Sequence, residues 1–478
     1  MKYFKLIFTL TILLTTNYSC SDFDDLNDDP NAATKVDPSA LLSYAEFQLF
    51  DEIHGRTLNA EWGMLMVQYW AQNEYCEESR YDVTEDTFDN SWSLLYTDVL
   101  KELETAKSLI ELQDLAETVK VNQKNIIDVL KVHTFMILTD GFGDIPYTEA
   151  LNIEYDLPGY DSQELIYKSM LSTLANAAST YDLSSPSFAK GDIIYNGDVA
   201  KWKKYTHSLL LRLAMRIVDA DPSTASTYIT AASSDLISSL SEEAIFNFDS
   251  TSDRANPLWR DVVLNSRDDF CVSELLVTTL ASKSDPRLDK FSKETTTGSI
   301  IGMPYGLTDN EATLLKPTTS RPDDSLRDNT SPSVIFSLAE VQFLLAEAYE
   351  RGILSGSAET AYANAIKASM NYWGITDDAA INSYISSQPY SSANWKESIG
   401  MQKWIALYMN GYEAWAEWRR LDYPQLEVPS AAVISSIPTK LPYPRSEVSN
   451  NSASLGKVST TPGTVSYTHL TLPTNREV

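Results

Sequence analysis

The hydrophobic and polar positions between Leu338 and Trp373 form the clearest pattern in the chain. Apolar residues in the first half of this stretch recur three or four positions apart: Val341, Leu344, Leu345 and Ala348. This spacing predicts a helix with one apolar face. Ser337 precedes the run and Glu340 follows three residues later, which predicts a capping box at the start of that helix.

A turn and a second helix complete the stretch. Gly352 and Gly356 bracket the turn, where glycine can adopt a positive φ at little cost. Small residues form one stripe of the second helix: Ala361, Ala365 and Ala368. They predict a close approach of two backbones, as in a helix pair of the tetratricopeptide kind. Because neither helix can bury its apolar face alone, further pairs are expected.

Similar patterns predict four helix pairs, at about 92–140, 162–219, 338–373 and 378–420. Four pairs suffice for an all-α, TPR-like α-superhelix. Two further helices are expected before them, over Leu41–Asp51 and Leu58–Gln72. The segment 222–336 is rich in Pro, Asp, Ser and Thr. It predicts a loop-rich irregular insertion with short elements and a functional role.

The amino terminus has the pattern of a targeting segment. Lys2 and Lys5 precede the apolar run Leu6–Leu14, which is too short to cross a membrane. The following Asn17–Cys20 resembles a bacterial lipobox, so we expect a signal peptide at 1–19 and lipid attachment at Cys20. The alternative is an ordinary secretory signal. We expect an acidic lead-in over 20–40.

The main domain is expected over 41–460, followed by an atypical tail. Residues 461–478 differ abruptly from the rest in composition, and we interpret them as non-native. The whole chain carries a formal net charge of −29, which disfavours nucleic acid as a partner because phosphate backbones are repelled. It contains 26 Tyr and 10 Trp, more than a core needs, so some should lie on the surface as contact platforms.

Catalytic chemistry finds little support in the sequence. There are four His, of which His133 and His207 fall within predicted helices, where a packed or hydrogen-bonded role is the common one. No protease, hydrolase or phosphate-binding motif is present, and we expect neither a metal nor a cofactor. Asp140 and Asp144 could suggest a glycosidase, but a turn that they cap explains them better.

Three smaller groups of residues have simple interpretations. Cys76 and Cys271 are expected as two buried thiols, with a disulfide as the open alternative. In Asp285-Pro286-Arg287 the arginine is expected to pair with a carboxylate, although a calcium site built on nearby Asp residues stays open. Charged residues on the last helix of the fourth pair are expected in surface ion pairs: Glu413, Glu417, Arg419 and Arg420.

Two loops have the composition of a sugar-binding site. Flat aromatic rings can cover the apolar face of a pyranose, and amides or guanidinium groups can bind its hydroxyls. The first loop supplies Trp70, Asn73, Tyr75, Arg80, Tyr81 and Trp92. The second loop consists of Asn256–Arg260 with Arg267–Phe270 and supplies Trp259 and Arg260. The alternative for Trp70 and Trp92 is that they anchor helix ends in the core. Four other tryptophans lie in helical patterns and are expected in the core: Trp202, Trp404, Trp415 and Trp418.

Several segments together resemble one known family. They are Val132–Leu151, Gly191–Arg216, Asp285–Leu288, Ala339–Gly352 and Gln402–Pro424. In these segments the chain is similar to the SusD/RagB family of outer-membrane lipoproteins, and most similar to its second SusD-like subgroup. The resemblance runs from Cys20 to about Glu447, and the tail 461–478 departs from it.

The resemblance implies a function. Members are lipid-anchored binding proteins on the cell surface of Bacteroidetes, and the acidic run after Cys20 resembles their surface-export signal. Each works with a SusC-like TonB-dependent transporter, to which it delivers an oligosaccharide or sometimes a peptide. The hypothesis is therefore a non-enzymatic nutrient-binding protein. The alternatives are a TPR-type protein-interaction scaffold without a small ligand, or a surface glycoside hydrolase.

Overall fold

The computed structural model describes residues 36–457. The expected signal peptide, Cys20 and the tail 461–478 lie outside these residues. The chain divides into two compact units, Met1–Asp37 and Pro38–Val478, and the second is described below. No helix within residues 36–457 is both long enough and apolar enough to cross a bilayer.

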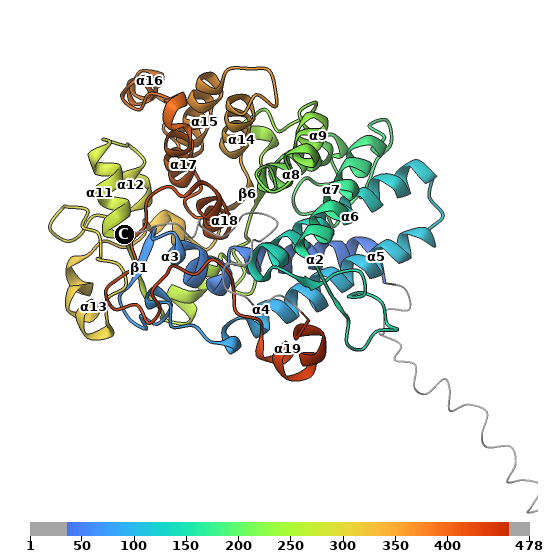
Figure 1. Ribbon diagram of the computed structural model, residues 1–478, viewed down its shortest axis with the longest axis horizontal. Coiled ribbons are helices and arrows are strands. Elements are labelled where there is room, and N and C mark those ends of the chain that lie inside the picture. The colour runs from blue at the N-terminus through green and yellow to red at the C-terminus, as the bar shows by residue number, and fades with distance from the viewer. Residues whose placement is uncertain (1–35, 458–478) are drawn as a thin grey trace, which may run out of the picture. The chain divides into compact units, whose positions relative to one another are not determined.

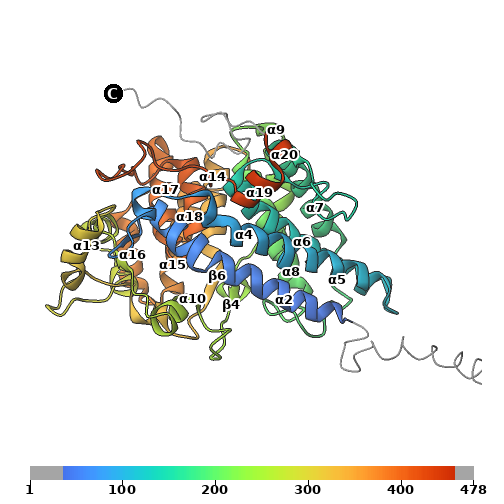
Figure 2. The same cartoon turned by 90° about the horizontal axis from the view of Figure 1, so that it is seen from below.

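The expected all-α fold is confirmed, and helices form nearly all of the framework (Figures 1 and 2). The four pairs contain α5 (Lys101–Glu111) with α6 (Glu117–Phe142), α7 (Gln163–Thr180) with α8 (Val199–Arg216), α14 (Leu338–Glu350) with α15 (Ala358–Tyr372), and α17 (Trp395–Ala406) with α18 (Gly411–Leu421). Successive pairs pack on one another, because α7 contacts α6 and α8, α8 contacts α14, and α14 contacts α17 (Figure 1). The region 378–420 has a third helix, α16 (Asp378–Ser387).

Shorter elements surround this framework. Before the first pair lie α2 (Pro38–Ile53), a π-helical turn (Arg56–Gly63), α3 (Met64–Met66) and α4 (Asp89–Leu94). The insertion has the short elements expected of it: α9 (Pro222–Ala232), α10 (Pro257–Trp259), α11 (Glu274–Ser282), α12 (Leu288–Phe291) and α13 (Asp309–Leu315). The last described helices are α19 (Arg445–Asn450) and α20 (Ser452–Leu455).

In the described part of the chain, six short strands form three separate antiparallel pairs. They are β1 (Trp70–Gln72) with β5 (Phe270–Val272), β2 (Ile145–Pro146) with β3 (Tyr160–Asp161), and β4 (Ala244–Phe246) with β6 (Ser333–Phe336). The helix expected over 58–72 was wrong at its end, because the helical backbone stops at Met66 and 70–72 joins a sheet. The apolar run there fits a buried strand as well as a helix.

The predicted N-cap at Ser337 is confirmed. The Ser337 hydroxyl accepts the backbone N–H of Glu340 at 3.1 Å, and Asp198 caps α8 in the same way. The Glu340 carboxylate, however, does not close a capping box. It pairs with the Arg212 guanidinium of α8 at 2.6 Å. Gly352 has the positive φ expected of the turn, +68°.

Charged residues of α18 correct another expectation. Glu413, Glu417, Arg419 and Arg420 are buried rather than on the surface. They belong to an internal network in which Arg216 meets Glu413 at 2.6 Å, Arg420 meets Glu347 at 2.5 Å, and Lys403 meets Glu417 at 2.8 Å. These ion pairs join α8, α14, α17 and α18. The second, third and fourth helix pairs are therefore held together by buried charges as well as by apolar packing.

A close crossing of α18 with the π-helical turn before α3 predicts one sensitive position. A Cβ on Gly63 would lie 2.2 Å from the backbone carbon of Gly411. Because backbone atoms cannot move aside, we expect Gly63→Ala to lower the free energy of unfolding by about 1–3 kcal/mol. Urea denaturation measures this. Gly159→Ala is the control, since its Cβ would meet only the flexible Glu149 carboxylate, at 3.3 Å. Equal stability of the two variants would contradict the prediction.

Candidate functional site

The structure brings together the two loops that the sequence analysis selected. Strand β1 of the first loop pairs with β5 of the second, with Gln72 opposite Phe270. The pairing continues beyond the strands: the Asn73 backbone N–H donates to Asp269 at 2.8 Å, and its side-chain amide donates to the Asp268 carbonyl, 195 residues away, at 3.1 Å. The two loops therefore form one local structure.

Four of the eight predicted ligand-binding residues lie in the interior. Trp70, Asn73, Tyr81 and Trp92 are buried. The Trp70 ring is 1% exposed, packs against Phe270 and donates its indole N–H to the Tyr408 hydroxyl at 2.9 Å. None of these side chains offers an exposed face to a sugar ring. Their burial agrees with the alternative that Trp70 and Trp92 anchor the core.

Trp92 also lies in a different neighbourhood. Its ring packs edge-to-face on Phe142 with 4.9 Å between centroids, and on Tyr443 with 6.4 Å. Both partners are remote from β1 and β5 in the chain, and neither belongs to the two loops. Trp92 is therefore a core residue of the first helix pair rather than part of the same site.

The other four predicted residues reach the surface. Tyr75 is 55% exposed, and the Arg267 guanidinium lies over its ring, 4.3 Å from the centroid. Trp259 and Arg260 are half-buried at the end of α10, where Arg260 pairs with Asp51. Arg80 is half-buried, with Nε donating to the Cys76 carbonyl at 3.2 Å. Tyr75 with Arg267 is the best exposed aromatic–cation pair of these loops.

A half-buried charge cluster extends from this pair. Asp269 accepts from Arg267 at 2.7 Å and from Arg56 at 2.8 Å, and Arg56 also meets Asp261 at 3.1 Å and Glu61 at 2.5 Å. Burial raises the pKa of Glu61 to about 7, although Arg56 beside it acts in the opposite direction. Such guanidinium and carboxylate groups can donate to and accept from sugar hydroxyls. We refer to Tyr75, Arg267 and this cluster as the loop site.

Sequence reasoning missed Arg56, Glu61 and Asp261. Arg56 and Glu61 precede the first aromatic loop, inside a segment with no sugar-binding composition. Only the pairing of β1 with β5 brings Asp269 to Arg56 across the fold, and no local pattern in the sequence predicts that register.

The two cysteines are free and buried, as expected. Burial raises the pKa of the Cys76 thiol to about 12, and Asp309 adds to this shift. Cys271 contacts the Asn73 amide and the Arg321 guanidinium instead of a second sulfur. The two thiols therefore line the interior of the joined loops without cross-linking them.

Carboxylates and histidines that could suggest catalysis have structural partners. Asp140 accepts from the Tyr167 hydroxyl, and Asp144 accepts the Gln163 backbone N–H at 2.9 Å. His133 contacts the Tyr205 hydroxyl, and His207 contacts the Ala232 carbonyl at 3.1 Å. The expected pairing of Arg287 is confirmed, with Asp285 as its buried partner at 2.6 Å. Within residues 36–457, no group of three or more His, Cys, Asp or Glu side chains could hold a metal ion.

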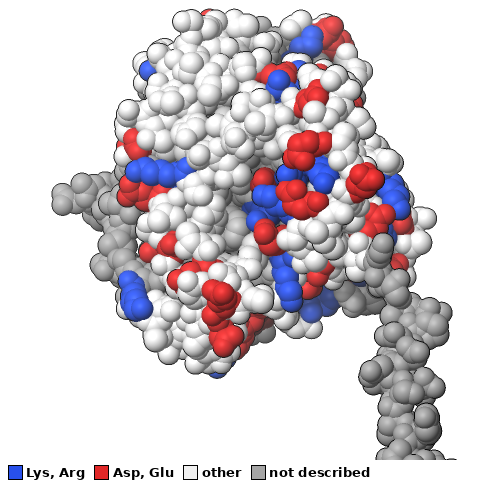
Figure 3. Space-filling model, turned by 90° about the vertical axis from the view of Figure 1, so that its right-hand side faces the viewer, with Lys and Arg blue, Asp and Glu red and all other residues white. Residues whose placement is uncertain are grey.

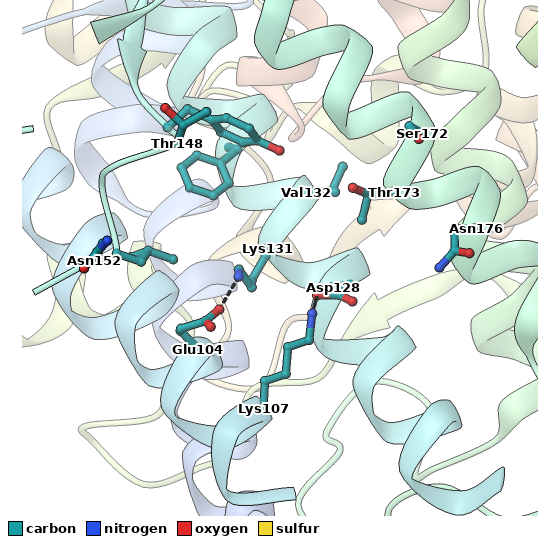
Figure 4. Close-up of a pocket in the computed structure, with 13 residues that line it drawn as sticks. Glu104, Lys107, Asp128, Lys131, Val132, Thr148, Asn152, Ser172, Thr173 and Asn176 are labelled. Atoms are coloured by element: carbon teal, nitrogen blue, oxygen red, sulfur yellow. Dashed lines mark hydrogen bonds and ion pairs between the residues drawn. The ribbon is translucent and has the colours of Figure 1, made fainter. Parts of the chain in front are cut away.

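A cavity of about 600 Å³ lies between α5, α6 and α7 (Figure 4). Lys107 pairs with Asp128 at 2.5 Å, and Lys131 pairs with Glu104, so the four charges of its lining cancel (Figure 4). Cationic and anionic side chains also lie side by side over the surrounding face (Figure 3). We refer to this as the helix-pair cavity. Its charges already have partners, which leaves it little to offer a charged ligand.

Comparison with known proteins identifies the family. A family model described as starch-binding associating with outer membrane matches residues 30–444. The chain belongs to this SusD-like family. Membership supports a role in binding nutrients at the outer membrane, and the family description names binding rather than catalysis. No curated protein matches the chain.

Solved structures of SusD-like proteins share the fold. A chitin-binding protein is 27% identical with a TM-score of 0.79, and the match covers 87% of this chain and 95% of that one. A SusD homologue from Bacteroides uniformis is 23% identical with a TM-score of 0.78, over 91% and 99% of the two chains. A SusD-like protein of Bacteroidetes is 23% identical with a TM-score of 0.76, over 91% and 99%.

Proposed function

We propose that this SusD-like protein captures an oligosaccharide at the cell surface and passes it to a SusC-like TonB-dependent transporter. No bond is made or broken in this process; affinity comes from stacking and hydrogen bonds. The observation that carries the proposal is the loop site, where Tyr75 is exposed beside Arg267 and the Arg56 cluster. An aromatic face next to paired donors and acceptors suits a sugar ring with its hydroxyls.

Chitin oligomers are the first ligand to test. The relative that is 27% identical is a chitin-binding protein, and its chain is matched nearly end to end. N-acetylglucosamine has an apolar ring face for Tyr75 and hydroxyl and amide groups for the charge cluster. A peptide remains the second ligand class to include in the same assay, since exposed aromatic residues serve both.

The membrane attachment and the transporter are parts of the same proposal. A lipid on Cys20 would tether the chain to the outer membrane, where acyl chains supply the binding energy. Mass spectrometry of the amino-terminal peptide from native membranes tests this, with an acylated Cys20 as the expected result. Affinity purification from the same membranes should recover a TonB-dependent transporter. An unmodified terminus and no transporter would overturn this part.

Two substitutions test the ligand site. We expect Tyr75→Ala and Trp259→Ala to weaken oligosaccharide binding by about tenfold or more, corresponding to ~1.4 kcal/mol each, because a stacked aromatic is often a dominant contact. Both side chains reach the surface, so the melting temperature should stay unchanged. Isothermal titration with chitin oligomers measures the affinity. Tyr155→Ala is the matched control, since Tyr155 is also an exposed tyrosine, 45% against 55% for Tyr75, but lies outside the loops. Unchanged affinity in both test variants would show that these loops do not bind the oligosaccharide.

A further inference from the structure

A second cavity, of about 470 Å³, lies where the insertion meets the third and fourth helix pairs. Its walls come mainly from the end of α15, the turn between α17 and α18, the start of β6 and the loop before it. None of Tyr75, Arg267, Trp259 or Arg260 lines it. We refer to it as the insertion cavity, and it is separate from the loop site.

One wall of the insertion cavity is aromatic and already held in place. Tyr372, Trp373 and Tyr408 line it. Phe291 stacks on Tyr408 with 4.1 Å between centroids, and Trp373 packs edge-to-face on Phe291 with 4.7 Å. Because this packing fixes the Trp373 ring before a ligand arrives, stacking on Trp373 costs little ordering entropy.

Another part of the lining is polar and free to bind. Ser331, Ser333 and Asn410 contribute half-buried side chains. The hydroxyls of Ser331 and Ser333 make no hydrogen bond to any residue of the described chain, and Asn410 makes only a long one, at 3.5 Å, to Val334. A lining that combines hydroxyl and amide groups with aromatic rings suits a pyranose, which has hydroxyls at its edge and an apolar ring face.

The charge of the insertion cavity sets it apart from the rest of the protein. The chain carries a formal net charge of −29, yet no Asp or Glu among residues 36–457 lines this cavity. Lys290 of α12 is the one charged residue in its lining, and it forms no ion pair within residues 36–457. By contrast, both lysines of the helix-pair cavity are neutralised. An unpaired ammonium favours an anionic group on the ligand.

We propose that the insertion cavity binds one residue of an acidic saccharide, a pyranose that carries a carboxylate. Its apolar face lies on Trp373, its hydroxyls meet Ser331 and Ser333, and its carboxylate faces Lys290. This goes beyond the function proposed above, because it gives the protein a second binding site with a different ligand class. It holds whether or not the loop site binds chitin oligomers.

The test compares acidic sugars with their neutral counterparts. Trimers of galacturonate, glucuronate and mannuronate, and the methyl ester of each, are titrated into the full-length protein by calorimetry. We expect at least one acidic trimer to bind about tenfold more tightly than its ester, since only the acid offers Lys290 a charged partner. Lys290→Met should remove this difference and leave the binding of the ester unchanged. Lys290 is exposed, so this variant should fold normally.

A blocking variant locates the binding. Ser331→Trp places a bulky ring in the insertion cavity and should abolish binding of the acidic trimer. Ser172→Trp makes the same change on α7, in the helix-pair cavity, and should leave binding unchanged. Tyr75→Ala should also leave it unchanged, which separates this proposal from the loop site. Equal affinity for acids and esters, no binding of any trimer, or full binding by a folded Ser331→Trp variant would each overturn the proposal.

Discussion

Replacing Arg420 with alanine is expected to lower the free energy of unfolding by about 3–5 kcal/mol. Arg420 forms a two-pronged contact with Glu347, at 2.5 and 2.6 Å, and a further bond to Glu417 at 2.7 Å. All three side chains are buried. The substitution would remove the two-pronged partner of Glu347 and one partner of Glu417, leaving Glu347 with Arg351 at 2.8 Å and Glu417 with Lys403 at 2.8 Å. Breaking a buried ion pair is far more costly than losing a surface pair, because the remaining charge is poorly solvated.

The pH dependence of this variant provides an independent check. Burial alone would raise the pKa of Glu347, but attraction to Arg420 holds it below its ordinary value of 4.5. In the wild type this carboxylate therefore contributes stability above pH 4.5 that is lost as the pH falls. Without Arg420 the pKa of Glu347 should be higher than in the wild type, because burial raises it and only Arg351 still lowers it. The deficit of the variant should then shrink in acid.

Urea denaturation at pH 7 and at acidic pH measures both effects. Arg445→Ala is the matched control, because Arg445 pairs with Asp86 on the surface, where the two side chains are 57% and 59% exposed. An exposed pair contributes about 0–1 kcal/mol. A loss at Arg420 no larger than that at Arg445 would show that the network of α18 is not a source of stability.

The contrast between the two arginines explains where sequence reasoning succeeded. Helix pairs such as α14 with α15 were predictable because their apolar spacing and the Ser337 cap are local. The network of α18 was not, because the partners of Arg216 and Arg420 are 197 and 73 residues away. A helix that carries several charges reads as a surface helix when its partners are unknown. The charges were therefore assigned to the wrong environment.

The sequence selected the two loops of the candidate site, but it did not predict which of their side chains are exposed and which are buried. Composition selected the two loops, and the pairing of β1 with β5 joins them. Every residue of β1 is buried, so the alternation that distinguishes inward from outward side chains is absent. The sequence therefore could not separate buried Trp70 from exposed Tyr75, five positions later. The insertion cavity was also beyond prediction, because its lining comes from distant segments.

Trp70 has a structural role that connects the two proposed sites. Its ring lies against Phe270 of β5, beneath the loop site, and its indole N–H reaches the Tyr408 hydroxyl, which belongs to a ring that lines the insertion cavity. Tyr408 in turn stacks on Phe291. The side chain thus supports the joined loops from one side and the aromatic wall from the other.

Trp70→Ala is therefore expected to lower the free energy of unfolding by about 3–5 kcal/mol, as the loss of a buried large aromatic does. Trp70→Phe should cost less, because it keeps most of the ring packing but leaves the Tyr408 hydroxyl without its donor. Thermal melts with urea denaturation measure the loss. Tyr75→Ala is the paired control, since it removes an exposed ring from the same loop and should change binding rather than stability.

Comparing the Trp70 variants with Tyr75→Ala distinguishes a residue that supports the fold from one that contacts the ligand. If Trp70 acts only through packing, the folded Trp70→Phe variant should keep its affinity for chitin oligomers and for the acidic trimer. Tyr75→Ala should lose its affinity for chitin oligomers but keep its affinity for the acidic trimer. A Trp70→Ala variant that melts like the wild type and binds neither ligand would instead make Trp70 a contact residue, and would require the loops to open on binding. The burial of Trp70, which is 1% exposed, and its hydrogen bond to the Tyr408 hydroxyl argue against that opening. Opening the loops would expose the ring and break this hydrogen bond, and a ligand would have to replace both interactions.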